Sequence, residues 1–180
     1  IIMIKRCSWV EEKEEIYIRY HDEEWGTAKY DDDILFEMLV LESFQSGLSW
    51  ITVLKKRESF RKAFDDFNIN KIVDYDDGKV RKLLENENII RHEGKIRATI
   101  SNAKVFMEIQ KEYGSFSDYI WGFTDGEIIK AEYKTESELS DKISKDLKKK
   151  GMKFVGSTTV YSYLEAIGVI DNHEKDCFRY

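Results

Sequence analysis

Four residues that can bind a metal lie near the two ends of the chain. Its only two cysteines are Cys7 and Cys177, and two of its three histidines, His21 and His173, lie close to them in sequence. If the four side chains converge, they form a Cys₂His₂ tetrahedron, which is typical of structural zinc and would tie the N-terminus to the C-terminus. Two buried free thiols are the alternative, because the thirteen residues between Cys7 and His21 match no short zinc-finger spacing.

Aromatic side chains are concentrated in the first 50 residues. Three of the four tryptophans, Trp9, Trp25 and Trp50, lie there together with Tyr17 and Tyr20. Aromatic residues of helical proteins usually belong to the core. The alternative is a pocket whose rings stack on a flat and positively charged ligand such as a nucleobase.

One carboxylate interrupts an apolar helix face in the same region. Residues 35, 38, 39 and 42 share one face of a helix that starts near residue 34, and the fourth of them is Glu42. An unpaired buried carboxylate is costly, so such a residue usually lies at an edge or pairs with Lys or Arg. The alternative is that Glu42 lines the aromatic pocket and binds a cationic or hydrogen-bond-donating ligand.

The elements that hold these residues are expected to be helices. The chain has no proline, and its apolar residues recur mostly at helical spacing. The spacing predicts helices capped at residues 31–33 and at Ser49, a short helix around residues 80–84, a long one ending at Gly114, and two more ended by Gly151 and Gly168. A Thr135–Glu138 capping box is expected to open the helix before Gly151. Residues 124–134 are expected to form a loop or small hairpin, and the predicted class is all-α.

Length and charge limit the class of protein. A chain of 180 residues fits one domain over residues 1–180, with two helical lobes as a variant. No apolar run is long enough to cross a membrane, and two cysteines without an export signal predict a soluble, cytoplasmic protein. The net charge of −6 argues against nucleic-acid binding in general, but basic residues cluster around positions 91–97 and 145–153. Solvated helix faces are the commoner explanation of such clusters.

The segment 88–96 joins two predicted helices by a short turn containing Gly94. In a helix–hairpin–helix, such a turn directs backbone N–H groups and a helix N-terminus at a DNA phosphate. Every pair of consecutive helices has a turn, so this segment by itself does not indicate DNA binding.

Several stretches together match one known pattern. They are residues 6–9 (RCSW), 20–26 (YHDEEWG), 35–39 (LFEML), 41–50 (LESFQSGLSW), 54–57, 89–92, 95–96, 102–103, 153–156, 172–173 and 177. These stretches resemble the 3-methyladenine DNA glycosylase I family, and the resemblance covers nearly the whole chain.

The resemblance implies a fold, an activity and a set of site residues. The fold is the all-α helix–hairpin–helix glycosylase fold, and the activity is removal of 3-methyladenine from alkylated double-stranded DNA, which leaves an abasic site. By the family pattern, one structural zinc is bound by Cys7, His21, His173 and Cys177. Glu42 faces the amino edge of the flipped base, while the pocket around it is formed by Tyr20, Trp50, Trp9, Tyr17 and Trp25. The DNA-binding hairpin at residues 88–96 includes Arg91, His92, Gly94 and Lys95.

We expect a monomeric, monofunctional glycosylase without a lysine Schiff base. Asp118 is the nearest candidate for the aspartate that many relatives use, and it is assigned no role. Three residues depart from the family pattern: Ala28, Ser46 and Glu93, of which the last is expected to weaken phosphate contact. Three alternatives stay open: an alkylpurine glycosylase of broader range, a non-catalytic zinc-stapled DNA-binding module, and a binder of flat cations that has no affinity for DNA.

Overall fold

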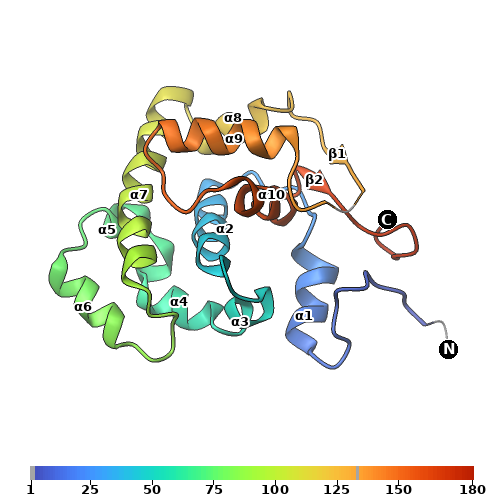
Figure 1. Ribbon diagram of the computed structural model, residues 1–180, viewed down its shortest axis with the longest axis horizontal. Helices are drawn as coiled ribbons and strands as arrows, with labels where there is room; N and C mark the ends of the chain where they lie inside the picture. Colours follow the sequence, from blue (N-terminus) through green and yellow to red (C-terminus); the bar gives the residue numbers. More distant parts are fainter. Residues whose placement is uncertain (1–2, 133) are drawn as a thin grey trace.

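The computed structural model describes residues 3–132 and 134–180, and nearly all of its elements are helical. In chain order the elements are α1 (Glu15–Arg19), the π-helical turn η1 (Tyr20–Glu24), α2 (Asp32–Gln45), α3 (Trp50–Lys55), α4 (Arg57–Ala63), the 3₁₀ turn η2 (Asp65–Phe67), α5 (Ile69–Ile72), α6 (Asp77–Glu85), α7 (Glu93–Tyr113), α8 (Phe116–Gly122), β1 (Ile129–Lys130), α9 (Glu138–Lys149), α10 (Ser157–Ala166) and β2 (Ile170–Asp171). The predicted all-α class is therefore confirmed. The described segments before α1 and after β2 lie on the same side of the molecule (Figure 1).

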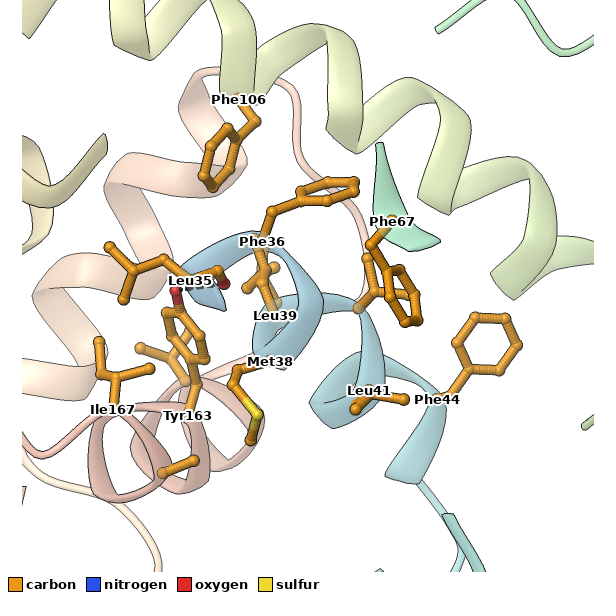
Figure 2. Packing of buried hydrophobic residues seen from close by; sticks show 14 of the residues in the cluster. Leu35, Phe36, Met38, Leu39, Leu41, Phe44, Phe67, Phe106, Tyr163 and Ile167 are labelled. Carbon is orange, nitrogen blue, oxygen red and sulfur yellow. Dashed lines mark hydrogen bonds between the residues drawn. The ribbon is translucent and has the colours of Figure 1, made fainter. Parts of the chain in front are cut away.

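Helix α2 lies at the centre of the fold. Asp31 caps it as predicted, because its Oδ1 accepts hydrogen bonds from the N–H groups of Asp33 at 2.9 Å and Ile34 at 3.2 Å. Figure 2 shows side chains from α7, η2 and the α10 region packed around it, and the Tyr163 hydroxyl donates to the carbonyl of Leu35 at 2.8 Å. The sequence predicted one apolar face, whereas α2 is buried on nearly every side from Leu35 onward. A helix held in this way is a rigid support for the side chains that it carries.

The other predicted helices are found, with different boundaries in one case. Helices α6, α7 and α10 end as expected, and Gly114 and Gly168 follow two of them with φ of +89° and +79°. The segment after Ser49 is broken into α3 and α4 at Lys56, which has a non-helical ψ of 0°. The Ser49 hydroxyl does not cap α3; it hydrogen-bonds the hydroxyl of Thr52 at 2.7 Å.

The predicted capping box of α9 was wrong by two residues. The N-cap is Ser137, whose hydroxyl accepts from the Ser140 N–H at 3.2 Å, and the Ser140 hydroxyl accepts from the Ser137 N–H at 2.7 Å. Ser140 also hydrogen-bonds Ser157 at the start of α10. The box therefore joins two helices, which the predicted Thr135–Glu138 pair would not do.

The segment 124–134 does not form a hairpin among its described residues, and residue 133 lies outside them. Strand β1 pairs instead with the distant β2, in parallel, with Ile129 opposite Ile170 and Lys130 opposite Asp171. This short pair fixes the chain just before Asn172 and His173. No helix in the described part of the chain is long and apolar enough to cross a bilayer.

Candidate functional site

One π-helical turn supplies residues to two neighbouring sites. In η1, the Trp25 N–H donates to the carbonyl of Tyr20 at 2.9 Å, the five-residue hydrogen bond that defines this geometry. Both Tyr20 and His21 are buried. Gly26 follows with φ of +71°, and a Cβ there would lie 2.6 Å from Cε1 of His173, so only glycine fits against that ring.

The first site is a buried cluster of sulfur and imidazole groups. Atoms of Cys7, His21 and Cys177 that can ligate a metal all lie within 4.8 Å of one another, and all three residues are buried. The thiol of Cys7 accepts from the backbone N–H of Glu174, and that of Cys177 from the backbone N–H of Arg179, both at 3.4 Å. The structure thus brings the two ends of the chain together, as predicted.

His173 lies beside this cluster, with its ring centroid 5.4 Å from that of His21. Its Nδ1 is 2.7 Å from Oδ1 of Asp171, just as Nδ1 of His21 is 2.7 Å from Oδ1 of Asp22. Histidines that bind metals usually have their other ring nitrogen hydrogen-bonded to a carboxylate in this way. The remaining nitrogen of His173, Nε2, is buried without a partner among the described residues.

The cluster could hold a metal ion. Two thiols and two imidazole nitrogens form a donor set that zinc prefers, and the orphaned Nε2 of His173 needs a partner of this kind. Burial lowers the pKa of both histidines, which favours the neutral rings that bind metals. Burial raises the pKa of the Cys7 thiol to about 12, so a thiolate there requires a nearby cation.

The second site is a cavity of about 170 Å³ that shares neighbours with the cluster. It is lined by all six residues that the sequence assigned to a base pocket, namely Trp9, Tyr17, Tyr20, Trp25, Glu42 and Trp50. Five further residues line it: Gln45, Ser162, Glu165, Asn172 and Glu174. The structure therefore places the predicted side chains around one cavity.

Aromatic rings form the walls of this cavity. Trp9 lies 5.1 Å from Tyr17 and 4.9 Å from Trp25 between ring centroids, and Tyr20 lies 5.2 Å from Trp50. Nε1 of Trp50 is buried without a hydrogen-bond partner among the described residues, so it can donate to a ligand. Burial and the charge of Glu42 raise the pKa of Tyr20, so its hydroxyl also remains a donor.

Glu42 is buried and unpaired, which excludes the edge and ion-pair interpretations of this residue. Only 4% of it is exposed, its Oε2 has no hydrogen-bond partner, and none of the ion pairs between described residues includes it. Burial raises the pKa of Glu42 well above its usual value, and the nearby charge of Glu165 raises it further. A cationic or hydrogen-bond-donating ligand would compensate this carboxylate.

Glu165 and Asn172 are two of the five cavity residues to which the sequence reasoning assigned no role. The amide of Asn172 donates to the Tyr161 hydroxyl at 2.7 Å and to Oε2 of Glu165 at 3.0 Å. Burial raises the pKa of Glu165 to about 7, although the hydrogen bond from Asn172 lowers it. Glu165 follows Tyr161 by four residues on an apolar helix face, so the signal that singled out Glu42 was also present here.

The predicted DNA-binding hairpin lies between α6 and α7. Arg91, His92 and Gly94 are exposed, and Nδ1 of His92 caps α7 by accepting from the Lys95 N–H at 3.1 Å. Asp118 is exposed in the first turn of α8 and does not line the cavity.

Lys95 does not fit the phosphate contact expected of its side chain. Its ammonium is buried and donates to the carbonyls of Phe44 at 2.9 Å and Ser46 at 2.6 Å. It therefore holds the end of α2 and the loop that leads to Trp50, because the last carbonyls of a helix need donors. Glu93, which departs from the family pattern, forms an ion pair with Arg97 at 3.1 Å on the exposed face of α7.

The sequence of the chain is similar to those of DNA-3-methyladenine glycosylases. A family model described as methyladenine glycosylase matches residues 9–180. The chain is 42% identical over 181 residues to a DNA-3-methyladenine glycosylase of Haemophilus influenzae, covering 97% of both, and 41% identical over 183 residues to DNA-3-methyladenine glycosylase 1 of Escherichia coli, covering 98% of this chain and 97% of that protein.

Solved structures agree with these relatives. A crystal structure of 3-methyladenine DNA glycosylase I superposes with a TM-score of 0.93 at 44% identity, covering 97% of this chain and 98% of the other. A structure of the Staphylococcus aureus enzyme, solved to explain 3-methyladenine recognition, gives a TM-score of 0.92 at 37% identity and covers 96% of this chain and 95% of the other.

Proposed function

The chain belongs to the methyladenine glycosylase family and is a DNA-3-methyladenine glycosylase. We propose that its aromatic cavity binds 3-methyladenine that has been flipped out of alkylated double-stranded DNA. The supporting observation is Glu42, whose buried Oε2 has no hydrogen-bond partner among the described residues, in a cavity walled by aromatic rings. An enzyme that cleaves a glycosidic bond in a duplex must first take the base out of the stack.

Charge is the proposed basis of selectivity. Methylation at N3 gives the adenine of the nucleotide a positive charge, which neutral adenine lacks. At about 4 Å and an effective dielectric constant near 20, a carboxylate attracts such a ring by about 4 kcal/mol. Stacking of a cation on Tyr20 and Trp50 adds up to about 2 kcal/mol, and Trp9, Tyr17 and Trp25 exclude water from the same cavity.

The same charge makes the base a good leaving group. Water adds to C1′ of the deoxyribose, the bond from C1′ to N9 breaks, and its electron pair passes to the base, which becomes neutral. The water loses one proton, and the products are 3-methyladenine and an abasic site. No lysine lines the cavity within the described chain, which supports a monofunctional enzyme that forms no Schiff base.

We propose that Cys7, His21, His173 and Cys177 hold one structural zinc. Four protein ligands leave no open coordination position, so the metal would cross-link the chain ends and take no part in hydrolysis. The orphaned Nε2 of His173 and the carboxylate partners of both histidines support this assignment.

The exposed turn between α6 and α7 is the proposed phosphate contact. Arg91 and the free N–H groups at the start of α7 would grip the DNA backbone, while Lys95 holds the loop after α2. We further propose that residues 1–180 act as one glycosylase domain and as a monomer.

The deciding experiment is mass spectrometry of the bases that the protein releases from methylated duplex DNA. Release of 3-methyladenine with equal formation of abasic sites is expected. Equal release of other methylated purines would favour the broader alkylpurine glycosylase, and binding to DNA without any release would favour the non-catalytic module.

A further inference from the structure

Two carboxylates, carried by two different helices, line the same cavity. Glu42 lies on α2 and Glu165 lies on α10, one turn after Ser162, which lines the cavity too. A single carboxylate suffices to attract one cationic ring. The second one is therefore an additional feature of the binding site.

The side chain of Glu165 is oriented by a neighbour and not by a cation. Its Oε2 accepts from the amide of Asn172 at 3.0 Å, and Asn172 is itself buried and fixed against the Tyr161 hydroxyl. The Gly26 N–H donates to the backbone carbonyl of Glu165 at 3.0 Å, which holds the end of α10 against the chain after η1. The carboxylate thus has a defined position at the cavity wall.

The nearby cations are bonded elsewhere. Lys29 donates to the carbonyls of Glu24, Thr27 and Ala166 at 2.7, 3.0 and 2.7 Å. Arg57 is paired with Glu24 and Glu37, and Arg179 donates to the carbonyls of His21 and Trp25. The other ionisable residues that face the cavity are Tyr17, Tyr20 and Glu174, and none of them carries a positive charge. Among the described residues, the two carboxylates share a cavity without a counterion.

We propose that Glu165 is a specificity-determining residue that contacts the bound base together with Glu42, so that two carboxylates select a cationic purine over a neutral one. The proposal rests on the function proposed above and adds a residue to its binding site. Two carboxylates that repel each other in a shared apolar site are unfavourable when both are ionised. A cationic base relieves that repulsion, whereas neutral adenine leaves it in place, so the second acid increases the difference between the two ligands.

A pair of ligands of the same shape tests this directly. The 3,9-dimethyladeninium ion carries a fixed positive charge and has a methyl group in place of the sugar, and 3-deaza-3,9-dimethyladenine is its neutral isostere. Calorimetric titration of the wild type should show tighter binding of the cation. In Glu165→Gln, which can still accept the Asn172 hydrogen bond, the preference for the cation should fall about tenfold, while affinity for the neutral isostere changes less than about twofold.

Glu23→Gln is the matched control, because it removes one negative charge from an exposed residue that does not line this cavity. It should leave the preference unchanged. An equal loss of affinity for both ligands in Glu165→Gln would show a structural role only, and an unchanged preference would show no role; either result overturns the proposal. Release of 3-methyladenine from DNA by the wild type is measured separately, so the proposed function can stand while this inference fails.

A second measurement compares the wild type with Glu165→Gln. Burial raises the pKa of Glu165 to about 7, so Glu165 holds a proton at pH 6 in the free protein, and a cation that contacts it should displace that proton. Calorimetry in buffers of different ionisation enthalpy counts the protons released by the wild type and by Glu165→Gln. Greater release by the wild type supports contact with Glu165, and equal release contradicts it.

Discussion

Tyr20 and His21 are consecutive residues of one π-helical turn, yet they lie in two different sites. Tyr20 packs against Trp50 in the cavity, and Nε2 of His21 lies 3.5 Å from the sulfur of Cys177. Asn172 and His173 repeat this arrangement, since Asn172 donates to Glu165 in the cavity and His173 lies beside His21. The Cys/His cluster and the aromatic cavity therefore share two short segments of backbone.

The first prediction concerns removal of the metal. Metal analysis should find about one zinc per chain, and a Cys7→Ser, His21→Ala double variant should lose it. Because η1 and residues 172–173 are then freed, the variant should melt at a lower temperature and bind 3-methyladenine at least about tenfold more weakly. A chelator should lower the melting temperature of the wild type and leave that of the variant unchanged. Zinc-free wild type with full stability would contradict the assignment.

The second prediction concerns Glu42→Gln. Excision of 3-methyladenine in single-turnover assays should fall by about 10²-fold or more, because the amide carries no charge to attract the cationic base. The fold should be as stable as the wild type or more so, since the substitution removes a buried and unpaired carboxylate. Undiminished excision would refute the role of Glu42.

Glu37→Gln is a control on the same helix. Glu37 accepts from Arg57 at 3.1 Å and from Arg61 at 2.6 Å and does not line the cavity. This change should lower the stability by about 1–3 kcal/mol, because it weakens a partly buried ion-pair network, and should leave excision near the wild-type rate. Glu42→Gln is thus expected to lose excision and keep its stability, whereas Glu37→Gln is expected to lose stability and keep excision.

The sequence was informative where a residue is governed by local rules. Helical spacing located α2, α6, α7 and α10, and the cap at Asp31 followed from its residue type. The odd position of Glu42 on an apolar face indicated a candidate pocket residue, although an edge position or an ion pair was the commoner interpretation. The resemblance to a family added the convergence of residues 7, 21 and 177, which no local rule specifies.

The sequence did not predict the features that depend on contacts between distant segments. The π geometry of η1 has no residue signature, and β1 pairs with β2 across some forty residues of chain. A lysine in a predicted DNA-binding turn looks exposed, and only the tertiary structure shows that Lys95 donates to the carbonyls of Phe44 and Ser46. Glu165 could have been found, because it too is an acid on an apolar helix face.

The third prediction concerns pH. Burial raises the pKa of Glu165 to about 7 in the folded state, whereas a Glu in the unfolded chain titrates near 4.5. The folded state therefore binds the extra proton between these values, so this residue makes the protein more stable as the pH falls from about 7 toward 4.5. Attraction of a cationic base should weaken over the same range, because the protonated acid carries no charge.

The difference in the free energy of unfolding between the wild type and Glu165→Gln isolates the contribution of Glu165. The stability of the wild type relative to the variant should increase by about 1–2 kcal/mol from pH 7.5 to pH 5, after allowance for solvent screening. Denaturant unfolding at several pH values provides the measurement, and the contribution of the Cys/His cluster cancels because both proteins have it. A constant difference across this range would show that Glu165 does not titrate there.

The proposed DNA-binding turn between α6 and α7 carries two basic residues that are expected to have different roles. Arg91 is exposed, so Arg91→Ala should weaken DNA binding and lower the salt dependence of log Kobs by about one unit, as expected for the loss of one phosphate contact.

Lys95→Met should leave that salt slope unchanged, because the buried ammonium donates to two carbonyls and not to DNA. It should instead cost about 1–3 kcal/mol of stability and slow excision, since the carbonyls of Phe44 and Ser46 lose their donor and the loop before Trp50 loosens. Filter-binding or fluorescence titrations at several salt concentrations, with denaturant unfolding of the same proteins, distinguish the two roles. A reduced salt slope in Lys95→Met would mean that the ammonium leaves its buried position and contacts phosphate when DNA binds.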